Sequence, residues 1–285
     1  EVKVRVPNQI RELAEPLVMW QSGIVDRERR LGRYVMPGVI SHAGLSNAME
    51  RAQQAISRGE SSAYQSVSRI ATAMRLHHLI NHLLCQGVAA SSEFLERLSR
   101  SEQSQNKSTR NFLRDGRVSS LRKSLTEMGE IHTKVSAVRR LVSERLRRNS
   151  DSRIIVFATF RDTVAAVEKS LDELDGARPI QFVGQSSRGG REGLTPKQQI
   201  ERLDKFRSGS ANVLIATSVG EEGLDIPSAD LVIFYEPVSS EIRTIQRRGR
   251  TGRHREGEVV VLIAEDTRDE GAMASSERRE EFMQR

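Results

Sequence analysis

The stretch that decides the fold runs from Val213 to Arg253 and reads VLIATSVGEEGLDIPSADLVIFYEPVSSEIRTIQRRGRTGR. Two short apolar runs inside it, 213–216 and 231–235, have the length and the β-branched content of buried parallel strands. A loop with two glycines separates them, and a short helix is expected from Ser239 to Gln246. That helix leads into QRRGRTGR, whose four arginines suit the binding of phosphate. An arginine cluster alone would favour a solvated basic surface, but this one follows two buried strands, at the edge where α/β folds bind ligands.

The sequence around this stretch alternates between strand and helix patterns. Strands are predicted over 154–158, 180–183 and 259–263, and helices over 163–174 and 195–207. Residues 131–285 are therefore predicted to form a parallel, three-layer α/β domain. Residues 1–130 show helical periodicity and no strand signal, so they are predicted to form a separate all-α domain, with a hinge near 129–133.

Charge is unevenly distributed between these two predicted domains. Residues 1–130 hold 19 Lys and Arg against 13 Asp and Glu, whereas residues 131–285 hold 26 against 25. A basic domain next to a phosphate-binding one points to nucleic acid as the partner. An excess of this size would not identify the partner by itself.

Several classes of protein are disfavoured by composition. No apolar run is long enough to span a membrane, so no membrane partner is expected. The single cysteine, Cys85, excludes an intrachain disulfide and a cysteine metal cluster, and it favours a reducing, intracellular location. His78 and His82 could share a helix face, but no third ligand is evident, so no metal site is predicted. The acidic pair Asp269 and Glu270 superficially resembles a Walker B motif. It does not lie at the tip of a predicted buried strand, and it follows the arginine-rich segment, so it is not predicted to hold a metal ion.

The octet QRRGRTGR resembles motif VI of superfamily 2 helicases, and the segment from Ala216 to Asp225 resembles motif V. The wider run GEEGLDIP, LVIFYEPV and IRTIQRRGRTGRH is similar to one branch of that superfamily, the archaeal Hef helicases and the Fanconi anaemia translocase FANCM. The resemblance implies that residues 131–285 are the RecA-like C-terminal lobe of a helicase. The run 75–79 and the pair Gln86-Gly87 resemble more weakly the thumb-like helical insert that grips branched DNA in this branch.

The resemblance also implies roles for residues that would face ATP. Arg250 and Arg253 are the candidate arginine fingers, and Gln246 would position the γ-phosphate or the attacking water. Gly223 would allow close approach of the nucleotide, and Asp225 would accept a hydrogen bond from the ribose. These five residues form the expected catalytic and nucleotide-binding set.

A second set of residues is expected to contact the nucleic acid. Thr217, at the tip of the strand over 213–216, would bind a phosphate through its hydroxyl and its amide. Thr159 and Arg161 match motif IV and would act in the same way. Gly184 and Gln185 begin a polar, basic loop that is either a plain surface connection or a site of backbone contact.

The sequence contains no G-x-x-x-x-G-K-[ST] motif and no Gly-Lys dipeptide at all. ATP and Mg²⁺ are therefore expected to be held mainly by a first RecA-like lobe that is absent here, and this chain alone is not expected to hydrolyse ATP. Joined to that lobe, the resemblance implies an ATP-dependent DNA helicase or translocase that acts on forked or branched DNA in replication-fork repair. Its expected location is the cytoplasm of a prokaryote or the nucleus of a eukaryote.

The sequence leaves two alternatives to a DNA helicase open. The chain could belong to an RNA-sensor or Dicer-like superfamily 2 helicase, which shares the helical insert and similar motifs, and which would act on duplex RNA. It could also be a non-catalytic nucleic-acid-binding module, although such a module would have no use for two arginine fingers.

Overall fold

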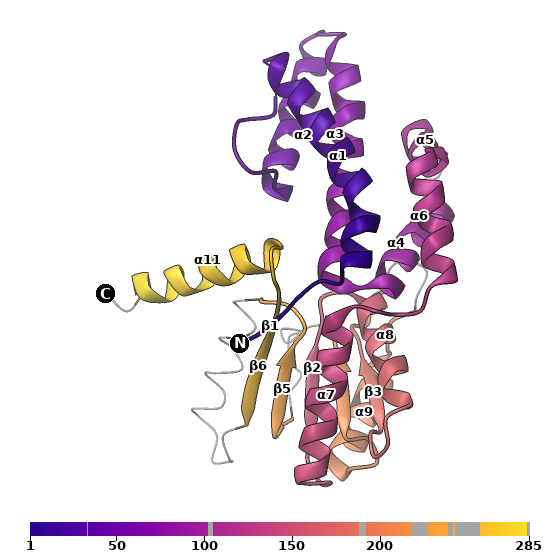
Figure 1. Ribbon diagram of the computed structural model, residues 1–285, viewed down its shortest axis with the longest axis vertical. Helices are drawn as coiled ribbons and strands as arrows, with labels where there is room; N and C mark the ends of the chain where they lie inside the picture. Colours follow the sequence, from indigo (N-terminus) through magenta and orange to yellow (C-terminus); the bar gives the residue numbers. More distant parts are fainter. Residues whose placement is uncertain are drawn as a thin grey trace. The chain divides into compact units, whose positions relative to one another are not determined.

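The computed structural model describes residues 1–32, 34–101, 105–187, 192–217, 227–238, 242 and 257–283, with side chains described up to residue 278 (Figure 1). The chain divides into two compact units. The lobe unit takes in 1–7, 85–90 and 129–285, and the helical unit takes in 8–84 and 91–128. The last segment of the lobe unit begins close to the predicted hinge, but two short earlier segments also belong to this unit.

The lobe unit is built on a six-stranded sheet whose described strand pairs are all parallel. Its strand order is β1-β6-β5-β2-β4-β3, which places β2, with its apolar sequence IIVF, in the interior. This arrangement confirms the predicted parallel α/β class. The strands are β1 (Val2–Val4), β2 (Ile154–Phe157), β3 (Pro179–Phe182), β4 (Val213–Ala216), β5 (Leu231–Phe234) and β6 (Glu258–Ala264).

The edge strand β1 corrects the expectation that residues 1–130 contain no strand. Val2 pairs with Leu262 and Val4 with Ala264, so β6 supplies the hydrogen-bonding partner that a three-residue segment needs. Val2 and Val4 are partly buried against the core of the lobe unit. The strand is too short to show a local pattern, and its partner lies near the other end of the sequence.

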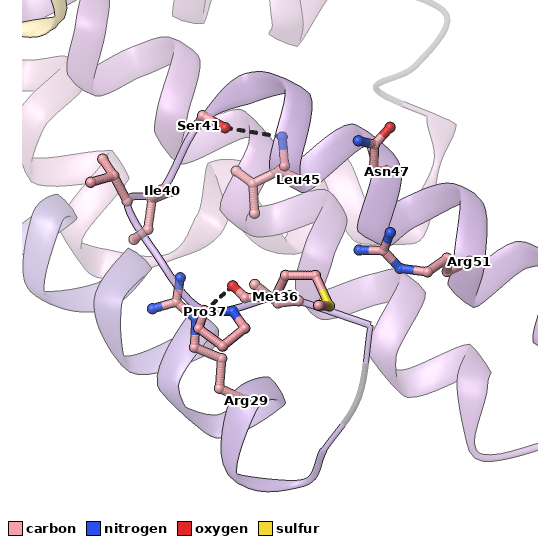
Figure 2. A pocket seen from close by; sticks show the side chains of 11 residues that line it. Arg29, Met36, Pro37, Ile40, Ser41, Leu45, Asn47 and Arg51 are labelled. Carbon is pink, nitrogen blue, oxygen red and sulfur yellow. Dashed lines mark hydrogen bonds between the residues drawn. The ribbon is translucent and has the colours of Figure 1, made fainter. Parts of the chain in front are cut away.

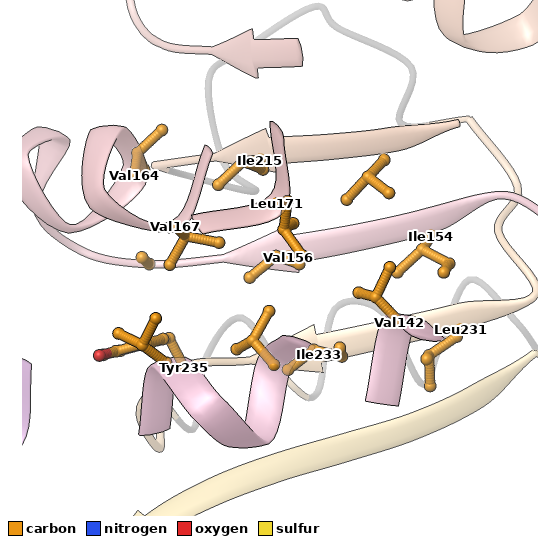
Figure 3. Close-up of a cluster of buried hydrophobic side chains, with 14 of the residues drawn as sticks. Val142, Ile154, Val156, Val164, Val167, Leu171, Ile215, Leu231, Ile233 and Tyr235 are labelled. Carbon is orange, nitrogen blue, oxygen red and sulfur yellow. The ribbon is translucent and has the colours of Figure 1, made fainter. Parts of the chain in front are cut away.

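Helices cover both faces of the sheet because residues alternate between the faces along each strand. On one face, strand residues such as Ile154 and Val156 pack with α7 (Thr133–Arg148) and α8 (Arg161–Asp172), as Figure 3 shows. On the other face, Ile155 and Phe157 pack in one cluster with Phe206 of α9 (Pro196–Ser208). Burial on both faces explains why these strands read as continuous apolar runs and not as alternating ones.

The helical unit is built from the helices of the first part of the sequence. They are α1 (Asn8–Arg30), α2 (His42–Ser57), α3 (Ala63–Asn81), α4 (Val88–Arg100, whose first three residues belong to the lobe unit), α5 (Lys107–Arg114) and α6 (Gly116–Glu127). The helix α1 continues through Pro16.

Small buried side chains let α2 and α3 pack closely in the helical unit. Ala48, Ala52 and Ile70 form one apolar cluster, and each is fully buried. A buried carboxylate joins α1 to α3, because Glu28 accepts a hydrogen bond from the Ser66 hydroxyl at 2.9 Å and pairs with Arg69 at 3.2 Å. The charge of Glu28 is thus compensated within the unit.

The remaining lobe segments are a junction and a last helix. The segment 85–90 begins within a π-helical turn (His82–Gln86) and passes through Gly87 at φ +143° into α4. The carboxylate of Glu130 accepts from the amide of Val88 at 2.8 Å, at the start of α4. Burial raises the pKa of Glu130, and hydrogen bonds from the amides of Val88 and Ala89 oppose that shift. The last helix, α11 (Arg268–Met283), follows β6.

Candidate nucleic-acid interface

Residues predicted to contact nucleic acid follow neighbouring strands of the sheet at their carboxyl ends. Thr159 follows β2, Gly184 follows β3 and Thr217 follows β4. The last residues of these strands are paired in register, Phe157 with Ala216 and Phe182 with Ala216. The structure therefore brings these predicted residues to one edge of the sheet, where ligands bind in open α/β folds.

Arg161 begins α8 and holds the loop that follows β3. Its Nη2 donates to the carbonyl oxygen of Gly184 at 3.1 Å and to that of Ser186 at 2.5 Å. Gln185 lies between these two residues, and its side-chain amide donates to Gln199 of α9 at 3.2 Å. Arg161 thus contacts the Gly184–Gln185 segment directly, which joins two parts of the predicted set.

The amides of the two threonines are already engaged within the protein. The Thr217 amide donates to the carbonyl oxygen of Phe182 at 3.3 Å, and the Thr159 amide donates to Glu236 Oε1 at 2.9 Å. A phosphate contact through the Thr217 amide, as expected from the sequence, would have to replace a bond between β4 and β3. The hydroxyl groups are therefore the better candidates for binding phosphate oxygens at these two positions.

Glu236 is a functional candidate that sequence reasoning missed. It follows β5 and is 7% exposed. Besides accepting from Thr159, its carboxylate accepts at Oε2 from the side-chain amide of Gln86 at 3.0 Å, and Arg268 Nη2 lies 3.8 Å from the same oxygen. It could have been predicted from its position directly after a predicted buried strand, because that position lies at the edge of the sheet where ligands bind.

Gln86 brings the segment 85–90 to the same edge. Its side-chain oxygen accepts from the Thr163 hydroxyl at 2.8 Å, and its backbone carbonyl accepts from the Tyr235 hydroxyl. Gln86, Thr163 and Tyr235 are each at most 1% exposed. Burial is also the main reason that the pKa of Tyr235 is raised well above its ordinary value. The pair Gln86-Gly87, attributed by resemblance to the insert, therefore packs in the lobe unit.

The residues predicted to face ATP lie outside the described part of the chain. This holds for Gln246, Arg250, Arg253, Gly223 and Asp225. Within the described part, no group of three or more His, Cys, Asp or Glu is arranged to hold a metal ion. His82 Nδ1 lies 2.7 Å from the carbonyl oxygen of His78, so this histidine contacts its own helix. No described helix is both long and apolar enough to cross a membrane.

A pocket of about 230 Å³ lies in the helical unit, beside the loop between α1 and α2 (Figure 2). Arg29 donates to the carbonyl oxygen of Met36 at 3.1 Å, and Arg51 donates to that of Tyr34 at 3.1 Å. Both arginines that line the pocket therefore hold the loop through its backbone. Nothing in the sequence had pointed to this feature.

Comparison with known proteins agrees with the motifs and the fold. Residues 133–255 match the family described as helicase conserved C-terminal domain. Over 96% of its length the chain resembles the crystal structure of the Pyrococcus furiosus Hef helicase domain, with a TM-score of 0.77 and 34% identity, and it covers 57% of that chain. This match includes the RecA-like α/β fold.

Two curated relatives show similarity at different ranges. A Methanocaldococcus jannaschii protein, whose provisional name is ATP-dependent RNA helicase, is 34% identical over 284 residues, all of this chain and 35% of the relative. The ATP-dependent DNA helicase mph1 of Aspergillus oryzae is 42% identical over 136 residues, which are 47% of this chain and 12% of that protein. The chain thus spans about a third or less of these relatives. Its lobe unit is a RecA-like C-terminal lobe of the superfamily 2 type, similar to that of the Hef and FANCM helicases.

Proposed function

We propose that this chain is part of an ATP-dependent DNA helicase or translocase that acts on forked or branched DNA in replication-fork repair. The observation that carries the proposal is the match to the Hef helicase domain over 96% of the chain, a range that includes both the lobe unit and the helical unit. In this proposal the lobe unit binds the DNA backbone and the helical unit contributes the preference for branches. The protein would act inside the cell, in the cytoplasm of a prokaryote or the nucleus of a eukaryote.

The carboxyl edge of the sheet supplies the groups for backbone binding. The hydroxyls of Thr159 and Thr217 and the polar loop at Gly184 and Gln185, held by Arg161, would contact phosphate oxygens. Contacts of this kind carry no base information, so binding should be independent of sequence and should weaken as salt rises. They also fit a motor that must move along any sequence.

ATP turnover is proposed for a polypeptide that contains a first RecA-like lobe as well. The residues of this chain fit a role on one side of the nucleotide, because the segment from 246 to 253 is rich in arginine but the sequence has no Walker A lysine. Arg250 and Arg253 would stabilise charge on the transferred phosphoryl group, and Gln246 would position the γ-phosphate or water. Gly223 and Asp225 would lie against the nucleotide. Mg²⁺ would be held mainly by the other lobe.

Equilibrium binding to three ligands tests the nucleic-acid part of the proposal. Forked DNA, linear duplex DNA and duplex RNA of the same sequence would be compared at several salt concentrations. We expect the fork to bind most tightly, and the Thr217→Ala variant to bind all DNA ligands more weakly. The Ser143→Ala variant, which removes a hydroxyl from α7, is the matched control and should bind as the wild type does. Absence of DNA binding at low salt would contradict the proposal.

The same experiment addresses the second candidate function. The similarity of all of this chain to about a third of a protein named as an RNA helicase favours an activity on duplex RNA as the alternative. Tighter binding of duplex RNA than of forked DNA would support that alternative.

A non-catalytic module is distinguished from a helicase by ATPase activity in a polypeptide with both lobes. There we expect Arg250→Ala and Arg253→Ala to lower kcat by about 10³-fold or more, whereas a module would show no turnover to lose.

A further inference from the structure

We propose that Gln86 is a positioning residue for the candidate interface. Its side-chain amide orients the carboxylate of Glu236, and Glu236 in turn holds the amide of Thr159, at the turn between β2 and α8. The inference rests on the proposed function, because the turn that Gln86 positions is the one proposed to bind the DNA backbone. It assigns this task to a segment of sequence that lies between two helices of the helical unit.

The hydrogen bonds of Gln86 determine the direction in which its amide points. A carboxylate can only accept hydrogen bonds, so the nitrogen of the Gln86 amide must face Glu236 Oε2, at 3.0 Å. The oxygen of the amide then accepts from the Thr163 hydroxyl at 2.8 Å. The Tyr235 hydroxyl fixes the backbone of the same residue through its carbonyl oxygen. Two contacts thus fix the orientation of the buried Gln86 amide, and a third holds the backbone of the same residue.

Glu236 transmits this orientation to Thr159. Its Oε1 accepts from the Thr159 amide at 2.9 Å, while Oε2 accepts from Gln86. Arg268 lies 3.8 Å from Oε2, which is beyond hydrogen-bond distance. Without the donor from Gln86, Oε2 would lose this hydrogen bond, and the carboxylate would be held less firmly against the Thr159 amide. The turn after β2 would then lose its fixed acceptor.

The segment 85–90 also gives this edge a covalent connection to the helical unit. It is joined on one side to α3 through the turn His82–Gln86 and on the other side to α4. The carboxylate of Glu130, in the lobe unit, accepts from the amides of Val88 and Ala89 and so fixes the second end of the segment. The residue that orients Glu236 therefore belongs to the connection between the units.

An exchange of the two side chains tests the inference. In Q86E, two carboxylates would face each other in a buried site, and in the double variant Q86E/E236Q the polarity of the pair is reversed but complete. The new amide at position 236 would then donate to the new carboxylate at position 86 and still accept from the Thr159 amide. That carboxylate would in turn accept from the Thr163 hydroxyl. We expect Q86E to weaken binding of forked DNA by about tenfold or more, which corresponds to a penalty of about 1.4 kcal/mol or more. The double variant should restore binding to within about threefold of wild type.

The single variant E236Q should have a smaller effect than Q86E. The Gln86 amide can turn over, because the Thr163 hydroxyl can accept as well as donate a hydrogen bond. The pair Gln181 and Glu168 offers a matched control, since the amide of Gln181 donates to Glu168 Oε1 at 3.1 Å between β3 and α8. The variants Q181E, E168Q and their combination change the same residue types in the same unit. They should alter thermal stability without the same pattern in DNA binding.

Two readouts separate positioning from a purely structural role. DNA binding is measured well below the unfolding midpoint of each variant, and the chemical shift of the Thr159 amide proton is followed by NMR. We expect this proton to shift in Q86E and to return towards its wild-type position in the double variant. If Q86E does not fold, Gln86→Met, which removes the donor without adding charge, takes its place. The inference is overturned if a folded Q86E or Gln86→Met protein binds forked DNA as tightly as wild type, or if the exchange restores neither readout. If the wild-type protein does not bind forked DNA, the proposed function is refuted. The NMR readout would still test whether Gln86 positions the Thr159 amide.

Discussion

Lys134 and Asp269 form an ion pair that is enclosed in the lobe unit. Nζ of Lys134 lies 2.6 Å from Oδ2 of Asp269, and the two side chains are 0% and 3% exposed. The same Asp269 oxygen accepts from the amide of Ala264 at 3.0 Å. One carboxylate thereby joins α7, β6 and the first turn of α11.

Removal of one partner from this pair should be costly. Lys134→Ala would leave the carboxylate of Asp269 buried without its cation, so we expect the free energy of unfolding to fall by about 3–5 kcal/mol. Urea denaturation followed by circular dichroism measures the change. The pair Arg207 and Asp204 on α9 is a control, because its charged groups lie 3.6 Å apart but both side chains are about half exposed or more. Arg207→Ala should change stability by less than about 1 kcal/mol. A loss at Lys134 as small as this would show that the pair contributes little.

Cys85 should make the stability of the protein fall at high pH. Burial raises the pKa of this thiol from 9.0 to about 11, and the nearby carboxylate of Asp269 adds to the shift. Below about pH 9 the thiol is neutral in both the folded and the unfolded chain. Between about pH 9 and pH 11 it ionises only in the unfolded chain, which favours unfolding by roughly 2–3 kcal/mol across that interval.

The measurement for Cys85 is a comparison of urea unfolding for wild type and Cys85→Ala over this pH range. The difference in stability between the two proteins should shrink by that amount as pH rises, because only wild type carries the titrating thiol. Other groups titrate equally in both proteins and cancel. A difference that stays constant from pH 8 to pH 11 would contradict the raised pKa.

Single residues show where sequence reasoning stops. Thr217 and Thr159 could be placed at the edge of the sheet, because a parallel strand pattern determines where the following residue lies. The partners of their amides could not be deduced. The role of Asp269 was not recognised either, because its cation lies on a helix that begins far away in the sequence. Pairing of this kind depends on tertiary packing, for which local patterns carry no signal.

At the scale of elements, Gly87 shows how a helix start can depend on a residue without a side chain. Its φ of +143° is a conformation that L-residues rarely adopt, and a Cβ there would collide with the carboxylate of Glu130. That carboxylate caps α4 through the amides of Val88 and Ala89. Alanine at this position would therefore strain the backbone and displace the cap together.

We expect Gly87→Ala to lower the free energy of unfolding by more than about 3 kcal/mol, the sum of a strained backbone and a lost cap. Gly176→Ala is the matched control, since Gly176 also has a positive φ, +80°, but nothing lies within 4 Å of a Cβ there. It should cost only about 1–2 kcal/mol. Chemical denaturation of both variants measures the difference. Equal losses would mean that the contact with Glu130 is unimportant.

Elements with strong local signals were predicted closely. The helix over Pro196–Ser208 begins at Thr195, whose side chain caps the amide of Gln198, while the Gln198 side chain bonds back to the Thr195 amide. This capping box is written in adjacent residues, so the sequence was sufficient. The strand β1 has no such local signal, because three residues form a strand only when a partner is present. The short helix predicted from Ser239 lies largely outside the described residues and stays a prediction.

At the scale of the whole molecule, the lobe unit is assembled from three separate segments of the sequence. A truncation at residue 130, the predicted boundary, would remove β1 and Gln86 together with the helical unit. It would leave β6 without its edge partner and Glu236 without its donor. A comparison of the chain with residues 131–285 alone would therefore confuse loss of DNA contacts with damage to the lobe. Substitutions on the surface of the helical unit avoid this problem.

The helix α5 offers such a surface for testing the proposed preference for branched DNA. Lys107, Arg110 and Arg114 are exposed and are spaced so that they share one side of this helix. Replacement of all three by alanine should weaken binding of forked DNA more than binding of linear duplex, and should lower the ratio of the two affinities by about tenfold. The slope of log affinity against log salt should decrease by up to about 3 for the fork, close to one for each lost phosphate contact.

The control for this test removes the same charge from the lobe unit. Arg140, Arg147 and Arg148 are exposed on α7, on the opposite side of the sheet from α9. Their replacement by alanine should lower all affinities slightly through the change in net charge and leave the ratio of fork to duplex unchanged. Equal ratios for both triple variants would show that α5 does not contribute to the choice of DNA structure.

The pairing of β1 with β6 has a consequence for the order in which the protein can fold during synthesis. Val2 and Val4 leave the ribosome before any other strand residues of this sequence, but their partners Leu262 and Ala264 are among the last strand residues to appear. While β2 to β5 are synthesised, β1 therefore has no partner strand. It can join the sheet only when β6 has emerged. Until then the nascent lobe presents an open edge, the kind of surface on which chaperones act and from which misassembly starts.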